Sequence, residues 1–142
     1  MTLCFLGAVP EAAVAGIARA CDVVAGSAAG GLALSAPVWL PRRRPRVLAV
    51  LIGDRDGELG ALQSKLSAAL VREKVYAPEA RRFLAHVTVA RVRGREKVDS
   101  APLPFPAPVE FAARHVTLYR SHLGGGPARY EMLHRIPLDG AG

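Results

Sequence analysis

The segment of residues 86–91, His-Val-Thr-Val-Ala-Arg, is the feature of this sequence that most limits its fold. Apolar and polar residues alternate along it, which is typical of a β-strand with one buried face. Residues two apart on a strand share a face, so His86 and Thr88 are predicted to project together, with Val87 and Val89 pointing into a core. An imidazole beside a hydroxyl can supply or accept a proton and hold a phosphate oxygen.

A partial copy of this pattern stands at the start of the chain, in residues 1–7, Met-Thr-Leu-Cys-Phe-Leu-Gly. Thr2 and Leu3 match the threonine and the apolar residue of the pattern, whereas a matching histidine would have to precede Met1. We expect the segment from Thr2 to Leu6 to form a short strand. Two equivalent strands would then face one another across a pseudo-twofold axis.

The remaining sequence alternates helical and strand patterns irregularly, which predicts a single α+β domain over residues 1–142. This length is sufficient to bury one core without disulfides or a metal. The expected helices are 11–24 and 58–73, and the expected strands are 32–35, 46–52, 86–93, 109–123 and 128–138. An exposed basic turn is expected at 41–45, an irregular loop at 94–108 and a glycine-rich turn at 124–127.

Two of these elements are predicted to form the core. The helix from Glu58 to Glu73 carries one apolar stripe, so one face of it should be buried. The residues of that stripe are Leu59, Leu62, Leu66, Ala69 and Leu70. The strand from Arg46 to Ile52 is nearly all apolar and is therefore expected to be buried on both sides.

Composition and charge favour a cytoplasmic protein without a membrane segment. No run of 18 or more apolar residues occurs, and the first residues lack a basic leader. Cys4 and Cys21 lack metal-site spacing, so both are expected to be reduced, buried thiols and no metal site is expected. The net charge is +7 and 16 of the 19 basic residues are arginine, which fits a polyanionic partner or GC-rich coding equally well.

Four stretches, taken in order, resemble the two-histidine phosphoesterases, specifically the bacterial RNA 2′,3′-cyclic phosphodiesterases, historically called 2′-5′ RNA ligases. Residues 2–10 and 83–91 resemble the family's two H-x-T-x motifs. Residues 41–48 resemble its basic turn into a buried strand, and residues 118–131 resemble its closing hairpin. The four stretches are spread over nearly the whole chain. The resemblance implies a two-lobed fold with antiparallel sheets around a central cleft and helices outside, here lacking the family's first strand and helix.

The resemblance also implies a reaction. The family hydrolyses a 2′,3′-cyclic phosphate terminus of RNA to a phosphomonoester, the 2′-phosphate, by histidine acid/base catalysis without metal or cofactor. A histidine has an ordinary pKa of about 6.5, so both of its protonation states exist near neutrality. By resemblance, His86 is the general base, and Thr88 and Thr2 are phosphate ligands. The first-motif histidine, the proton donor, has no counterpart, so we expect an N-terminally truncated chain with impaired activity.

Three further residues carry weaker interpretations. Arg91 could clamp a phosphate, but strict alternation puts it on the face opposite His86, and only a bulge or the strand end would return it. Tyr119 could stack on a base, with a core or surface role equally open. His115 also begins an H-x-T-x pattern, which we interpret as coincidental; it could partly replace the missing donor only if the sheet placed it beside His86.

Two alternatives to an active enzyme follow from the same sequence. One is a non-catalytic remnant of the fold that binds RNA or a nucleotide. The other is a structural fragment that self-associates through the strand edge left open by truncation. The expected partner is RNA or a nucleotide with a 2′,3′-cyclic phosphate end, with no membrane involved, and a complete chain is expected to be a monomer.

Overall fold

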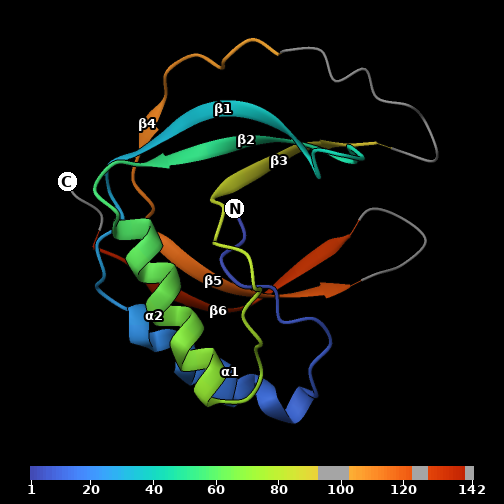
Figure 1. Cartoon of the computed structure of the whole chain (residues 1–142). Coiled ribbons are helices and arrows are strands. Elements are labelled where there is room, and N and C mark those ends of the chain that lie inside the picture. Colours follow the sequence, from blue (N-terminus) through green and yellow to red (C-terminus); the bar gives the residue numbers. More distant parts are fainter. Residues whose placement is uncertain (93–102, 123–127, 140–142) are drawn as a thin grey trace.

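Two antiparallel sheets and two helices make up the computed structural model, which describes residues 1–92, 103–122 and 128–139. The larger sheet has four strands in the order β3-β2-β1-β4, and the smaller is the hairpin of β5 and β6 (Figure 1). The strands are β1 Leu32–Leu40, β2 Val47–Asp54, β3 His86–Arg91, β4 Glu110–Phe111, β5 His115–His122 and β6 Arg129–Pro137. The helices are α1 Val14–Cys21, between 3-10 turns at Glu11–Ala13 and Asp22–Val24, and α2 Glu58–Arg72. The predicted α+β class is confirmed.

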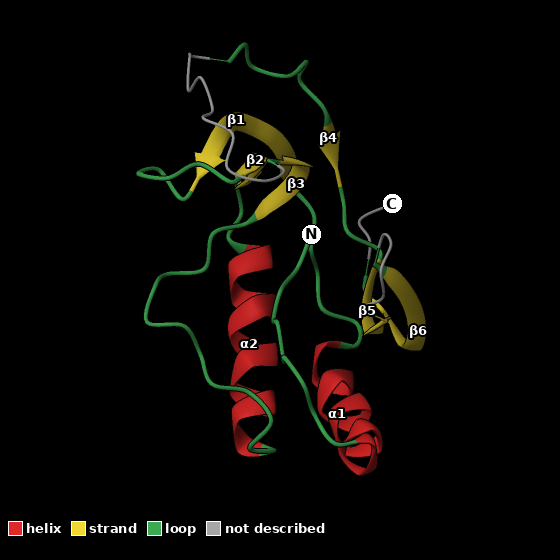
Figure 2. Ribbon diagram, turned by 90° about the vertical axis from the view of Figure 1, so that its right-hand side faces the viewer, coloured by secondary structure: helices red, strands yellow, loops and turns green. Residues whose placement is uncertain are grey.

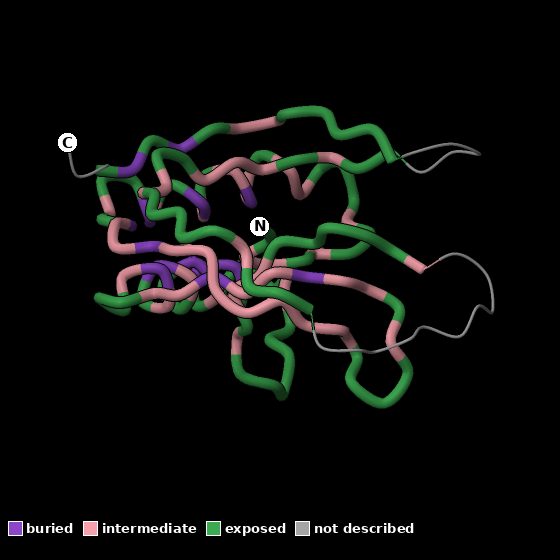
Figure 3. The backbone as a smooth tube through the Cα atoms, turned by 90° about the horizontal axis from the view of Figure 1, so that it is seen from above, coloured by how far each residue is buried: buried purple, intermediate pink, exposed green. Residues whose placement is uncertain are grey.

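The main core lies where both helices meet the hairpin. All five residues of the predicted stripe on α2 are buried, and the continuous helical run over residues 11–24 agrees with expectation. Figure 3 shows that the buried stretches gather at one end of the molecule. The core residues from these elements are Ile17, Cys21, Val24, Ala29, Leu62, Leu66, Leu70, Ile136 and Leu138. The helices therefore fix the hairpin from one side only and leave its other face uncovered by them.

The start of α2 is held by a carboxylate from the end of β2. The chain turns through Gly57, whose φ of 73° is in the left-handed region that favours glycine. Asp54 then accepts hydrogen bonds from the backbone N–H groups of Leu59 at 3.3 Å and Gly60 at 2.8 Å. These donors would otherwise be unsatisfied, and the negative charge sits at the positive end of the helix dipole.

Replacing Asp54 by alanine should therefore lower the free energy of unfolding by about 1 kcal/mol, the usual effect of losing an N-terminal cap. Urea unfolding of the variant measures this. Asp56→Ala is the matched control and should change stability little, because among the described residues Asp56 makes only an exposed ion pair with Arg55 at 3.5 Å. Equal stability of the two variants would show that the cap contributes nothing.

The strand β3 lies at the edge of the larger sheet and departs from one expectation. Val87 and Val89 were predicted to point into a core, but they are 38% and 60% exposed. That prediction is wrong because β3 pairs only with β2 among the described residues and no helix covers its outer side. The neighbouring strand β2 is central as predicted, yet only Ala49 and Ile52 of it are fully buried, so it is not buried along its whole length.

The long strand predicted over 109–123 is instead two strands in different sheets. β4 pairs with β1, whereas β5 pairs with β6. The chain leaves the first sheet at Ala113, whose N–H donates to the carbonyl of Ala29, and then enters the second. Of the predicted loop and turn, residues 94–102 and 124–127 lie outside the described residues. The predicted hairpin strand near the C-terminus is confirmed as β6.

The predicted strand from Thr2 to Leu6 is wrong. Within the described part of the chain this segment forms no helix and pairs with no strand, and Phe5 is 79% exposed. It is held instead by side chains: Gln63 on α2 donates to the carbonyl of Leu3 at 3.4 Å. Figure 2 shows the N-terminal segment passing between α2 and the hairpin. No helix in the described part of the chain is long and apolar enough to cross a membrane.

Candidate active site

The pairing of β3 with β2 places the motif's two polar side chains on one face. His86 pairs with Leu51 and Thr88 with Ala49, and residues two apart on β2 share a face. The imidazole is half-buried, whereas the threonine is exposed. The predicted juxtaposition of imidazole and hydroxyl is thus present in the structure.

A bulge in β3 changes the position of the arginine that closes the motif. The ladder slips by one residue, leaving Val89 as an extra residue that opposes no residue of its own. Such a bulge reverses the alternation of faces beyond it. Arg91 pairs with Val47, which shares the face of Leu51, so the arginine lies on the same face as His86. The strict alternation expected from the sequence is wrong here, and a bulge cannot be recognised in a run of such uniform β-forming residues.

The ring of His86 is held in one orientation by the backbone. Its Nδ1 lies 2.7 Å from the carbonyl oxygen of Leu84. A carbonyl only accepts hydrogen bonds, so Nδ1 carries the proton. In the neutral ring Nε2 is then an unprotonated acceptor, which is the form a general base requires. Nothing in the motif itself indicated this contact, because it depends on the path of the chain before the strand.

The structure brings the N-terminal segment close to the start of β3. Leu3 and Ala85, the neighbours of the two motif residues Thr2 and His86, pack against the same cluster of buried side chains. That cluster consists of Leu32, Ile52 and Leu59. The N-terminus lies beside the beginning of β3 in both views (Figures 1 and 2). Thr2 is exposed there, although the segment that carries it is not a strand.

The hairpin presents a polar and aromatic face on the side away from the helices. Val116 and Leu118 of β5 pack against the main core, so His115, Thr117 and Tyr119 lie on the opposite face. Tyr119 is 54% exposed. Its ring meets Tyr130 edge to face, with ring centroids 6.1 Å apart and planes at 74°. Figure 2 shows the hairpin beside α1, to one side of α2 and the larger sheet.

His115 does not have the form of a substitute acid. The guanidinium of Arg135 lies 3.0 Å from its Nδ1. Because a guanidinium only donates, this nitrogen must accept and be unprotonated. The other two histidines are also engaged, His122 with Glu131 at 2.9 Å and His134 with Asp22 at 2.6 Å.

The two cysteines offer neither a nucleophile nor a metal site. Burial raises the pKa of the Cys21 thiol to about 11, and burial also raises that of Cys4. Both are therefore protonated at neutral pH, and protonated thiols are poor nucleophiles and ligands. Across residues 1–92, 103–122 and 128–139, no three His, Cys, Asp or Glu side chains gather as a metal would require.

Several solved structures share this arrangement. The crystal structure of TT0787 of Thermus thermophilus superposes with a TM-score of 0.70 at 26% identity, covering 98% of this chain and 77% of that one. The crystal structure of E. coli LigT complexed with 3′-AMP gives 0.71 at 27% identity, covering 97% and 75%. A crystal structure of a phosphoesterase gives 0.71 at 27% identity, covering 96% and 75%. No protein-family profile and no curated protein sequence matches the chain.

The strand orders, the two helices and these superpositions define the class of protein: the chain has the two-lobed α+β fold of the two-histidine phosphoesterases. Within that class its structural neighbours are LigT and TT0787, which supports placing it in the same superfamily with a phosphoesterase or 2′-5′ RNA ligase-family function.

Proposed function

We propose that this chain carries the site of an RNA 2′,3′-cyclic phosphodiesterase, which hydrolyses a 2′,3′-cyclic phosphate end to the 2′-phosphate. The observation that supports the proposal most is the shared face of His86, Thr88 and Arg91 on one strand. An imidazole with an unprotonated Nε2, a hydroxyl and a guanidinium together suit an anionic diester: the imidazole accepts a proton, and the other two groups bind oxygens.

In the proposed reaction Nε2 of His86 takes a proton from water while the water oxygen attacks phosphorus. The bond from phosphorus to the ribose 3′ oxygen breaks, and that oxygen must receive a proton. Thr88 and Thr2 would hold the non-bridging oxygens, whose negative charge grows as the attack proceeds. Arg91, farther along the same face, would attract the anionic substrate. The exposed ring of Tyr119 would stack on the base of the same nucleotide.

The proton for the leaving oxygen would come from a first-motif histidine, whose position is immediately before Met1. Among the described residues His115 does not replace it, because Arg135 holds its Nδ1 as an acceptor. Losing one general acid usually slows a reaction about 10²- to 10⁴-fold. We therefore propose that the 142-residue chain is an impaired enzyme.

Hydrolysis of a nucleoside 2′,3′-cyclic phosphate by the untagged chain tests this proposal. We expect slow but His86-dependent formation of the 2′-phosphate, identified by phosphorus NMR, and the same rate in excess EDTA. An affinity tag must be removed first, because a leader ending in histidine would place an imidazole at the missing position. A rate equal to that of E. coli LigT would contradict the impairment, and exclusive 3′-phosphate would contradict the assigned bond.

A second candidate function is nucleotide binding without turnover. It is favoured by the structures of the neighbour LigT, which has been crystallised with 3′-AMP and with NADP+. Binding of 3′-AMP that is unchanged in His86→Ala, together with no hydrolysis after a histidine is added ahead of Met1, would favour this function over the first.

A further inference from the structure

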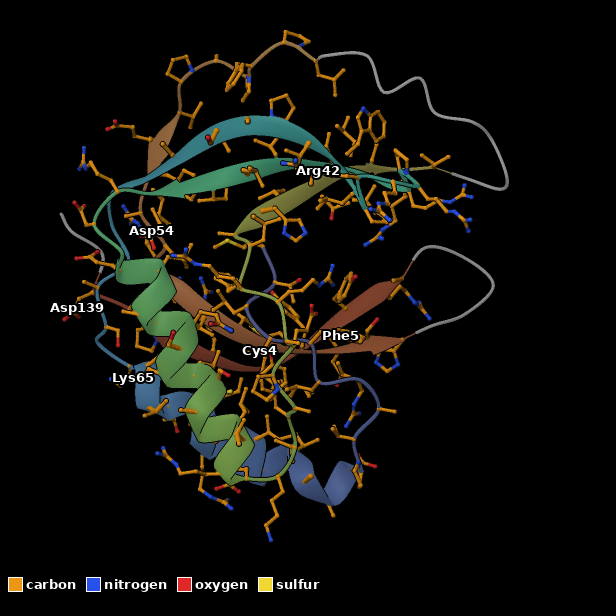
Figure 4. The ribbon with its side chains drawn as sticks, in the orientation of Figure 1. Cys4, Phe5, Arg42, Asp54, Lys65 and Asp139 are labelled. Atoms are coloured by element: carbon orange, nitrogen blue, oxygen red, sulfur yellow. The ribbon has the colours of Figure 1, made fainter. Side chains whose placement is uncertain are left out.

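The turn between β1 and β2 carries three consecutive arginines at the end of the sheet nearest Arg91. They are Arg42, Arg43 and Arg44, all exposed, between prolines at positions 41 and 45. Figure 4 places Arg42 at this far end of the β1–β2 hairpin. The sequences of β1, of the turn and of β3 contain no Asp or Glu, and β2 has only Asp54 at its opposite end. This region is therefore strongly positive.

These guanidinium groups are available for a ligand. Within the described residues, the three turn arginines and Arg91 make no side-chain hydrogen bond or ion pair, in contrast to the paired Arg120. Four like charges close together repel one another, which costs stability unless an anion compensates them. A planar guanidinium that is free to donate is the group best suited to a phosphate.

The positive turn adjoins the strand that carries the proposed active site, but it lies at a distance from His86. Arg91 pairs with Val47, at the base of the turn, and His86 pairs with Leu51. Four strand residues correspond to about 13 Å. One phosphate cannot span this distance, so an anion at the turn is not the phosphate that reacts at His86. Phosphates of adjacent nucleotides are closer together than this, so the anion at the turn would belong to a nucleotide more than one position upstream.

We infer that the arginine turn is a second binding site, for backbone phosphates of single-stranded RNA upstream of the reacting terminus. The inference rests on the proposed function. It adds that the preferred substrate is an oligonucleotide with several nucleotides before its cyclic end, bound both at the arginine turn and at the site around His86. An anionic membrane would not explain why a further arginine, Arg91, lies next to the turn on the face of the sheet that carries His86.

The test compares two triple variants that remove the same charge. Arg42, Arg43 and Arg44 are replaced by glutamine in one, and Arg19, Lys65 and Arg72 in the other. The control residues are exposed on α1 and α2, away from the turn, as Lys65 shows in Figure 4. Binding of a labelled single-stranded RNA of about ten nucleotides is measured by anisotropy at several salt concentrations.

We expect the turn variant to bind this RNA about 10- to 100-fold more weakly at low salt. In a plot of the logarithm of the binding constant against the logarithm of the salt concentration, the slope should be smaller by about 0.7 for each RNA phosphate that the variant no longer neutralises. The helix variant should differ little from the parent chain. Binding of 3′-AMP, which has no upstream phosphates, should be the same in all three proteins.

Three results would overturn the inference: equal weakening in both variants, equal weakening of 3′-AMP binding, or a larger loss of binding to anionic lipid vesicles than to RNA. Failure of the proposed function is a distinct result, because it shows as absent hydrolysis of the nucleoside cyclic phosphate whether or not RNA binds. Both triple variants are checked for a native unfolding transition. If the turn variant does not fold, Arg43→Gln alone is tested, and we expect a smaller loss of RNA affinity.

Discussion

Adding a histidine directly ahead of Met1, after a new initiator methionine, is expected to raise the hydrolysis of a nucleoside 2′,3′-cyclic phosphate about 100-fold or more. The new residue stands two positions before Thr2, the spacing found between His86 and Thr88. It would emerge beside the start of β3, where the N-terminus lies. A positioned general acid commonly contributes about 10²- to 10⁴-fold. The coil conformation of the segment favours the lower end of that range.

The pH profile of the extended chain should change as well as its rate. A base alone gives a rate that rises with pH, whereas a base and an acid together give a bell-shaped profile. The added imidazole would therefore introduce a falling limb above neutrality. The control is the same extension with glutamine in place of histidine, which keeps the length but cannot donate a proton as an acid. Equal rates for the two extensions would show that this position does not reach the substrate.

The fold of this chain was largely predictable because its strongest patterns are local. The stripe on α2 follows directly from apolar spacings of three and four, and all five of its residues are buried. The hairpin of β5 and β6 follows from two strand-forming stretches around a glycine-rich turn. The features of the fold that the sequence did not predict depend on how distant elements pack together. Val87 and Val89 are exposed because no described helix covers that side of β3, and which side is covered is set by the packing of distant elements rather than by the residues themselves.

The candidate site was predictable in its residues but not in its geometry. His86 and Thr88 could be paired from the period of a strand alone. The orientation of the imidazole depends on the carbonyl of Leu84, and the face of Arg91 depends on the bulge at Val89. No particular residue type marks a carbonyl that will accept a side-chain hydrogen bond, or a position where a strand will form a bulge. For the same reason the segment after Met1 was predicted as a strand: its β-forming residues could not reveal that no neighbouring strand pairs with it.

The second large effect is expected from His86→Ala in the chain extended by histidine. Its kcat/KM for the nucleoside cyclic phosphate should fall about 10²- to 10⁴-fold, because water loses the base that accepts its proton. Binding of 3′-AMP should change much less, since Thr88 and Arg91 remain on the same face. Steady-state kinetics and isothermal calorimetry give the two quantities. His122→Ala, which removes an imidazole paired with Glu131 on the hairpin, is the control and should leave both nearly unchanged.

The two histidines should also be non-additive, because the acid and the base act in one step. Residues that act as a unit lose most of their joint effect when either is removed. In the His86→Ala background, the extension with histidine should therefore be no faster than the extension with glutamine, whereas with His86 present the two differ about 100-fold or more. A gain of the same size in both backgrounds would mean that the added imidazole acts without His86. The base would then have to be sought elsewhere, and the shared face of His86, Thr88 and Arg91 would be no more than a polar edge of the sheet.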